Sequence, residues 1–226
     1  MKRYAVYAVP GAHDADASEA VRLRAVAEAW FARAEVQDLT RDARRYGFHA
    51  TLKAPMRLAP GRTETELCAA ADAFATRRGA LMITAPRIAT IGSFRAVVPS
   101  EGQETELTTL ASDALRAFDE FRAPLDDADR RRRRPERLTP RERELFERWG
   151  YPYVLDEFRF HMTLTDAVPA ERSAQIDDAL EAHFQPVSGV DVPLTAIAIC
   201  IEPSPGAAFE LLSVHPFALR SPRENA

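Results

Sequence analysis

Tyr46-Gly-Phe-His-Ala-Thr-Leu-Lys53 and Phe158-Arg-Phe-His-Met-Thr-Leu-Thr165 are two stretches of the chain with one shared pattern. Both contain Phe-His-x-Thr-Leu, and their histidines, His49 and His161, are 112 positions apart (161 − 49). Residues two apart in a β-strand share a face, so alternating apolar and polar residues predict an amphipathic strand in each stretch. One such sequence alone carries little information, whereas two matching copies indicate a shared role.

The polar faces of the two predicted strands carry the candidate site. The first face consists of Arg45, Gly47, His49, Thr51 and Lys53. The second face consists of Arg159, His161, Thr163 and Thr165. An imidazole, a hydroxyl and a cation cannot enter a dry core without partners. We therefore expect the two faces to form the walls of a wet, polar groove.

These side chains suit the hydrolysis of a phosphodiester without a metal ion. The reaction needs one group that takes a proton from water and another that protonates the leaving oxygen, and two imidazoles can do both near neutral pH. We predict His49 and His161 as this pair, in either order. Hydroxyl donors and cations can hold the phosphate and offset charge in the transition state. The other predicted catalytic residues are Thr51 and Thr163, and the predicted substrate-binding residues are Tyr46, Lys53, Arg159 and Thr165.

The elements around the two strands follow a similar order in each half of the chain. Strands are expected at 3–9, 46–53, 81–84, 87–91, 94–98, 158–165, 191–201 and 207–216. Helices are expected from caps at 14–18 to about 34, and at 63–78, 105–121, 141–149 and 170–184, with a polar connection at 122–140. The pattern predicts a single α+β domain of two similar lobes, roughly 1–100 and 101–226.

Composition narrows the class of protein. The 226 residues are 46% hydrophobic and 28% charged, as in a soluble globular domain, and a net charge of −4 gives no basic field for a long nucleic acid. No run approaches the roughly 20 apolar residues of a membrane span, and the alternating start is unlike a signal peptide, so we expect a cytoplasmic protein. Cys68 and Cys200 lack metal-ligand spacing and are expected as free thiols. No metal or cofactor is predicted, and the oligomeric state stays open.

The run Arg130–Arg134 allows two interpretations. Acidic residues flank it on both sides, which favours a solvated loop. Alternatively, it forms an arginine-rich flap that helps to hold an anionic substrate. The sequence leaves both interpretations open.

The paired motifs resemble those of the 2H phosphoesterase superfamily, which is named for two His-x-Thr sequences. Within it, the chain is most similar to the DUF1045 branch, whose members are called phosphonate metabolism proteins and are encoded near carbon–phosphorus lyase genes. The similar stretches are Arg45-Tyr-Gly-Phe-His-Ala-Thr-Leu-Lys-Ala-Pro55, Ile91-Gly-Ser-Phe-Arg-Ala-Val-Val-Pro99, Tyr151-Pro-Tyr and 158–165. The resemblance implies a bilobal 2H phosphoesterase-like fold, in which two similar lobes of antiparallel sheet plus helices surround a central cleft. One histidine strand from each lobe then faces that cleft. The resemblance also implies hydrolysis of a cyclic or linear phosphodiester, or a related transfer.

The favoured function is metal-independent hydrolysis of a small phosphodiester or cyclic phosphate, such as a cyclic phosphate on ribose, in phosphonate metabolism. Two alternatives stay open: an RNA-end 2′,3′-cyclic phosphodiesterase or ligase-like enzyme, and a non-catalytic binder of phosphorylated metabolites. The small net charge disfavours the first, because tracking a strand needs a basic surface. The intact acid–base pair disfavours the second. The expected partner is thus a small phosphorylated substrate, rather than a nucleic acid or a membrane.

Overall fold

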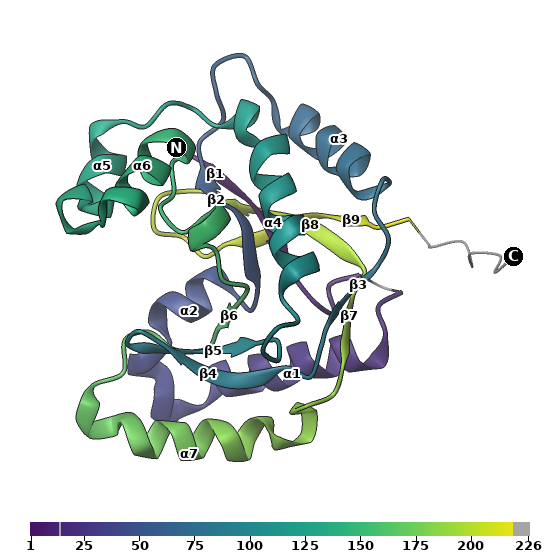
Figure 1. Ribbon diagram of the computed structural model, residues 1–226, viewed down its shortest axis with the longest axis vertical. Coiled ribbons are helices and arrows are strands. Elements are labelled where there is room, and N and C mark those ends of the chain that lie inside the picture. Colours follow the sequence, from purple (N-terminus) through teal and green to yellow (C-terminus); the bar gives the residue numbers. More distant parts are fainter. Residues whose placement is uncertain (14, 219–226) are drawn as a thin grey trace, which may run out of the picture.

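A computed structural model describes residues 1–13 and 15–218, apart from the side chain of Arg132. The expected helix cap at residue 14 lies outside the described residues. The fold is α+β, as predicted: seven strands form one antiparallel sheet in the order β4-β5-β6-β2-β1-β8-β9, and β3 and β7 form a separate pair (Figure 1).

The elements have the following bounds. The strands of the large sheet are β1 (Arg3–Ala8), β2 (Ala50–Met56), β4 (Arg87–Ile91), β5 (Phe94–Val98), β6 (Met162–Thr163), β8 (Ala196–Glu202) and β9 (Glu210–Pro216). The separate pair consists of β3 (Leu81–Ile83) and β7 (Val192–Leu194). The helices are α1 (Ser18–Ala32), α2 (Arg41–Tyr46), α3 (Glu64–Ala75), α4 (Thr105–Ala117), α5 (Asp127–Arg133), α6 (Pro140–Trp149) and α7 (Ser173–Phe184).

Local sequence explains where two of the helices, α3 and α6, begin and where α6 ends. At α3, the Thr63 hydroxyl accepts from the Glu66 N–H, and the Glu66 carboxylate accepts from the Thr63 N–H, which is a capping box. Thr139 makes the same arrangement at the start of α6, and Gly150 ends α6 at a φ of 77°, a left-handed conformation that glycine adopts without strain. The chain therefore leaves α6 in a sharp turn just before Tyr151.

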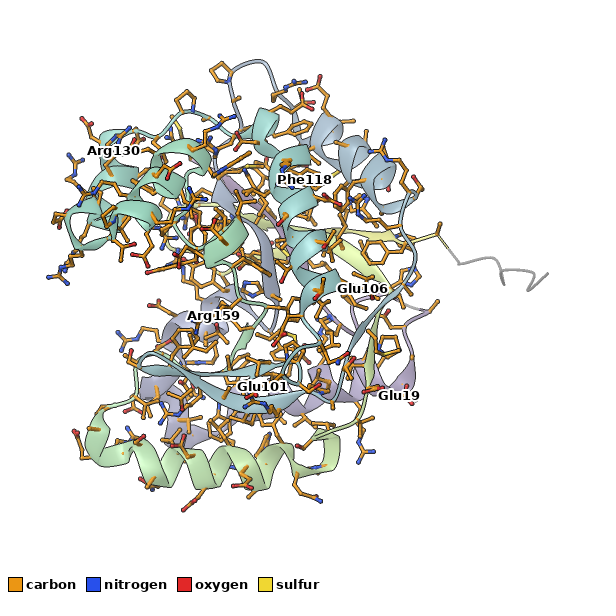
Figure 2. The ribbon with its side chains drawn as sticks, in the orientation of Figure 1. Glu19, Glu101, Glu106, Phe118, Arg130 and Arg159 are labelled. Carbon is orange, nitrogen blue, oxygen red and sulfur yellow. The ribbon has the colours of Figure 1, made fainter. Side chains whose placement is uncertain are left out.

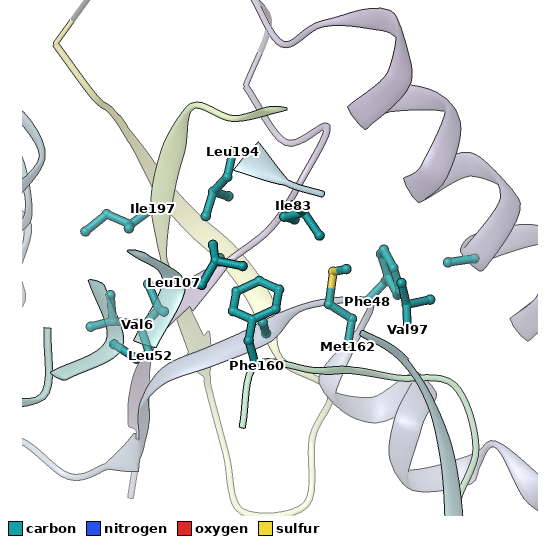
Figure 3. Close-up of a cluster of buried hydrophobic side chains, with 14 of the residues drawn as sticks. Val6, Phe48, Leu52, Ile83, Val97, Leu107, Phe160, Met162, Leu194 and Ile197 are labelled. Atoms are coloured by element: carbon teal, nitrogen blue, oxygen red, sulfur yellow. The ribbon is translucent and has the colours of Figure 1, made fainter. Parts of the chain in front are cut away.

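The apolar residues of both motif stretches face the main core, as the alternation predicted. Phe160, Met162 and Leu164 are each at most 2% exposed. Figure 3 shows Phe160 and Met162 beside Leu52, in a cluster to which α4 and β8 contribute Leu107 and Ile197. Burial of this face fixes which way the intervening polar residues point, because a slip of one residue would turn every side chain over.

The two expected lobes do not correspond to consecutive halves of the chain. In the sheet order, β6 from the second half lies between β5 and β2 from the first half. Likewise, β1 pairs with β8 on one edge and β2 on the other. A boundary near residue 100 is therefore wrong as a structural division, because antiparallel pairing joins strands from both halves into one sheet.

Several expected elements differ from those in the structure. The strand predicted at 158–165 is reduced to β6, whose pairing residues are Met162 and Thr163, and a short 3-10 turn occupies Leu155–Glu157 just before it. The strand predicted at 46–53 begins only at Ala50, because Tyr46 ends α2 and Gly47 has a φ of 72°. The polar connection at 122–140 contains α5, which Asp126 caps. Period-two patterning thus located the motif strands but not their ends.

Candidate active site

The two motif strands are hydrogen-bonded neighbours, so their polar residues share one surface. Ala50 on β2 pairs with Met162 on β6 in antiparallel register. One residue further along each strand, this register places His49 opposite Thr163 and Thr51 opposite His161. The histidines are then diagonal neighbours, with Cα atoms about 7–8 Å apart for such a pair. The polar faces therefore form one floor with approximate two-fold symmetry, not two opposing walls.

His49 is held firmly by its own strand and by β1. Its Nδ1 lies 2.9 Å from the Gly47 carbonyl oxygen, and its Nε2 lies 3.2 Å from the Thr51 hydroxyl. The ring stacks on Tyr7, with centroids 3.7 Å apart and planes at 23°. Burial and, to a smaller extent, the positive charge of a protonated His161 lower the pKa of His49 to about 4, although the hydrogen bond to Gly47 opposes the shift. At neutral pH His49 is therefore uncharged and able to accept a proton.

His161 repeats this arrangement in the second motif. Its Nδ1 lies 2.7 Å from the Arg159 carbonyl oxygen, two residues earlier, and its ring lies 5.6 Å from that of Phe94. A carbonyl oxygen only accepts, so Nδ1 carries the proton in both histidines and Nε2 is left for the pocket. Burial also lowers the pKa of His161. The equivalent tautomers give the floor two matched sites for proton transfer.

A polar cavity of about 520 Å³ lies over this floor. Six of the eight predicted site residues line this cavity: Tyr46, His49, Thr51, His161, Thr163 and Thr165. The other two, Lys53 and Arg159, do not line it. A second cavity of about 440 Å³, lined largely by apolar and aromatic side chains, adjoins it. The two cavities share Thr51, Ala54, Phe94, Tyr151 and His161. A ligand at the histidine pair could thus extend in either direction.

Lys53 does not lie with the other site residues, so the prediction that it faces the groove is wrong. Its side chain is 2% exposed, and its Nζ donates to Asp119 at 2.6 Å and to the Leu115 carbonyl at 3.3 Å. The cause is a β-bulge: Val6 of β1 pairs with Lys53, but the next residue, Tyr7, pairs with Thr51. The extra residue shifts the alternation and turns Lys53 toward α4.

The remaining predicted substrate-binding residues border the cavities from three places. Tyr46, at the end of α2, stacks on Phe209 with ring centroids 5.1 Å apart. Thr165 is 1% exposed, and its hydroxyl accepts from the Arg95 N–H at 2.9 Å. Arg159 is exposed, lines the apolar cavity and lies at the opening between the α5–α6 region and β4–β5 (Figure 2). These three residues surround the floor without touching one another.

The structure adds four residues that were not among the predicted site residues: Arg3, Tyr7, Arg133 and Tyr151 line the polar cavity. Alternation along β1 could have placed Arg3 and Tyr7 on one face, but nothing in the sequence paired β1 with the first motif. Arg133 belongs to the arginine run, and it lies 4.4 Å from the ring centroid of Tyr151. One guanidinium of the arginine run thus lines the cavity, as the interpretation of the run as a flap would require.

The chain belongs to the DUF1045 family, whose model, described as a protein of unknown function, matches residues 51–210. It is 41% identical over 178 residues to ribose 1,5-bisphosphate phosphokinase PhnN of Janthinobacterium sp., covering 77% of this chain and 39% of that protein. It is 36% identical over 235 residues to the protein of the same name from Laribacter hongkongensis, covering 92% of this chain and 50% of that protein. The chain thus spans half or less of these relatives.

Solved structures with similarity to the chain include a phosphoesterase and E. coli LigT complexed with NADP+. Each has a TM-score of 0.46, at 11% and 15% identity, and covers 96% of this chain and 98% of the other. A likeness at this level does not indicate a shared substrate. Within residues 1–13 and 15–218, no helix is long and apolar enough to cross a bilayer. Over the same residues, no cluster of three His, Cys, Asp or Glu side chains could hold a metal ion.

Proposed function

We propose that this chain hydrolyses a cyclic phosphodiester of a phosphorylated sugar, with His49 and His161 as its acid–base pair. The observation that carries the proposal is the register of β2 and β6, which sets two imidazoles of the same tautomer diagonally on the floor of one cavity. A phosphoryl group between them would have a proton acceptor on one side and a proton donor on the other, as in-line attack by water requires.

We assign His49 as the base and His161 as the acid. The pKa of His49 is about 4, so its Nε2 is unprotonated over the whole neutral range. In the structure Nε2 accepts from the Thr51 hydroxyl, and it can take a proton from water once that hydroxyl turns to the phosphate. We give His161 the acid role because its charge adds to burial in lowering the pKa of His49, so a proton on His161 disfavours a proton on His49. The water oxygen forms a new P–O bond, the P–O bond to the ring oxygen breaks, and the Nε2–H of His161 protonates that leaving oxygen. The two histidines end with exchanged protonation states, which one proton transfer through solvent resets.

The hydroxyls of Thr51 and Thr163 are placed to hold the phosphate between the histidines. Each threonine lies opposite the other motif's histidine in the strand register, so the four groups alternate around one point of the floor. Hydroxyl donors aimed at non-bridging oxygens stabilise the charge that grows there as the water attacks, and they need no reorganisation when they are already in place.

The relatives' name indicates the chemical class of the product. Those proteins are named for a kinase that acts on ribose 1,5-bisphosphate. The sequence contains no glycine-rich G-x-x-x-x-G-K loop of the kind that cradles nucleotide phosphates, and it spans only part of those relatives. We therefore do not assign the kinase step to this chain. A hydrolase that opens a cyclic phosphate on ribose would supply a ribose phosphate to it, consistent with a role in phosphonate metabolism.

Turnover of cyclic phosphates in excess EDTA tests the proposal. The panel contains ribose 1,2-cyclic phosphate, 2′,3′-cyclic nucleotides and a short RNA that ends in a 2′,3′-cyclic phosphate. His49→Ala and His161→Ala should each lower kcat by about 10²–10⁴-fold. His183→Ala is the matched control, because that imidazole bonds the Val26 carbonyl away from the cavities and should leave the rate unchanged.

Three outcomes would overturn the proposal. Turnover that requires added divalent metal would contradict the two-histidine mechanism. Preference for the RNA end over every small substrate would replace the substrate class. Tight binding of phosphorylated ligands without turnover of any compound would identify a binding protein.

A further inference from the structure

The polar cavity extends beyond the histidine floor to a cluster of tyrosines and arginines that the proposed mechanism does not use. Its members are Arg3, Tyr7, Tyr46, Arg133 and Tyr151, all of which line that cavity. They come from β1, the end of α2, α5 and the turn after α6. Segments far apart in the sequence therefore converge on one wall, next to His49.

The Tyr7 hydroxyl is the clearest sign that this wall binds something. Tyr7 is 1% exposed, and within the described part of the chain its hydroxyl is buried without any hydrogen-bond partner. A buried donor without an acceptor costs free energy, and native proteins rarely keep one that serves no purpose. The ring is already used, since it stacks on His49, but stacking needs only the ring and not the hydroxyl.

The other two tyrosines line the same cavity as Tyr7. Burial raises the pKa of Tyr7 well above 10, and nearby Tyr46 and Tyr151 raise it further, whereas the charge of Arg3 opposes them. The three hydroxyls and this guanidinium are thus close enough to affect one ionisation. Each hydroxyl can donate one hydrogen bond, so the cluster itself consists of donors. The cavity also has two carboxylates, Asp42 and Asp166, and that of Asp166 accepts from backbone N–H groups at the start of α2.

Two guanidinium groups give the wall its charge. Arg3 bonds the buried carboxylate of Glu202, but Arg45 bonds the same carboxylate, so this group of three keeps one net positive charge. Arg133 lies over the Tyr151 ring at 4.4 Å, and no carboxylate of the described residues lies within ion-pair distance of it. Cations not neutralised by protein carboxylates favour a doubly charged anion over a neutral group.

We infer that Tyr7, Tyr46, Tyr151, Arg3 and Arg133 form a second anion subsite that binds a terminal phosphate monoester. The inference rests on the proposed function and extends it, because it makes the preferred substrate a cyclic phosphate that carries a second phosphate at its far end. A phosphate monoester has three terminal oxygens that only accept hydrogen bonds when it is fully ionised, which matches a wall of hydroxyl and guanidinium donors.

Paired substrates and two variants test the subsite. The substrates are ribose 1,2-cyclic phosphate with and without a 5-phosphate. The 5-phosphorylated compound should have a KM at least tenfold lower in the wild type. Tyr7→Phe keeps the ring on His49 and should raise that KM about tenfold, and Arg133→Gln should raise it about 10–100-fold, as expected for a hydrogen bond to a charged group. Both variants should leave the KM of the unphosphorylated compound within about twofold.

Arg131→Gln is the matched control, since this exposed arginine is on the same helix but does not line the cavity. A general loss of positive charge on α5 would raise KM in this variant as well, and that result would overturn the assignment to Arg133. Thermal unfolding of Tyr7→Phe should occur at or above the wild-type Tm, because the substitution removes an unpartnered buried hydroxyl. A clear loss of stability would mean that the hydroxyl has a partner within the protein.

Calorimetric binding of ribose 5-phosphate separates the subsite from the catalytic proposal. Binding that is weakened in Tyr7→Phe and Arg133→Gln supports the subsite even if no cyclic phosphate is ever hydrolysed. Conversely, turnover that depends on both histidines but is indifferent to the 5-phosphate would overturn the subsite and leave the hydrolase intact.

Discussion

The ion pair between Lys53 and Asp119 gives a stability effect whose size depends on pH in a specific way. Lys53 is a buried residue of β2, and burial lowers its pKa from 10.5 to about 8, although the hydrogen bond and the charge of Asp119 oppose the shift. We expect Asp119→Asn to destabilise the protein, because the lysine loses its carboxylate while staying out of water. Arg122 also loses the carboxylate that it bonds at 2.8 Å.

The lysine part of the cost has an upper limit, since Lys53 can escape by releasing its proton. At pH 7 the charged form of the wild type is favoured by about one pKa unit (8 − 7), which corresponds to about 1.4 kcal/mol. Loss of Asp119 can therefore cost no more than about 1.4 kcal/mol through the lysine at this pH. At pH 9 the wild-type lysine is already mostly neutral, and this part of the cost falls to about 0.1 kcal/mol.

Urea unfolding at pH 7 and pH 9 measures this difference. The destabilisation by Asp119→Asn should be about 1 kcal/mol smaller at pH 9, while the loss for Arg122 is the same at both pH values. Lys53→Met is the matched control: it should stay within about 1 kcal/mol of the wild type and keep full activity, because the ammonium lies outside both cavities. A pH-independent effect of Asp119→Asn, or an inactive but folded Lys53→Met, would refute the structural role of Lys53.

Three further substitutions test the site and its supports. His161→Ala should raise the pKa of His49 from about 4, though not to 6.5, because the like charge is removed while burial remains. NMR titration of the His49 imidazole measures this pKa, and an unchanged value would contradict the proximity of the two histidines. Asp166→Ala should cost about 1 kcal/mol in urea unfolding, since its carboxylate accepts from backbone N–H groups at the start of α2, and no loss would mean that solvent replaces it fully. Burial opposes ionisation of Glu202, yet hydrogen bonds led by that from Arg3 lower its pKa to about 2 from 4.5, so Glu202→Gln should cost about 3 kcal/mol at pH 7. That loss should disappear as the pH falls from 4.5 to 2, and a loss that persists at pH 2 would contradict the assignment.

Much of the floor of the candidate site could be predicted from the sequence. Two copies of Phe-His-x-Thr-Leu placed His49, Thr51, His161 and Thr163 on polar faces, and these residues meet in one cavity. The prediction worked because a period of two is a local property of a strand whose other face is buried. The same rule failed for Lys53, since a bulge that depends on the register with β1 shifts the alternation after Thr51.

The residues that form the wall of the cavity could not be predicted from local sequence patterns, because contacts between distant segments bring them together. Tyr7 and Arg133 are 126 positions apart (133 − 7) and reach the cavity from β1 and α5. In the sequence, β1 is simply an apolar strand, and the arginine run is equally typical of a solvated loop. Which of its arginines would reach the cavity depends on how α5 packs near Tyr151.

The sequence by itself therefore determined the α+β class, the two motif strands and the four His and Thr side chains of the floor. Only the tertiary structure decided that the strands are neighbours in one sheet, that Lys53 belongs to the core side, and that tyrosines and arginines surround the pocket. The physical reason is the range of the interactions. Side-chain alternation and helix capping act over a few residues, whereas strand register, bulges and the walls of a cavity arise from the packing of distant segments.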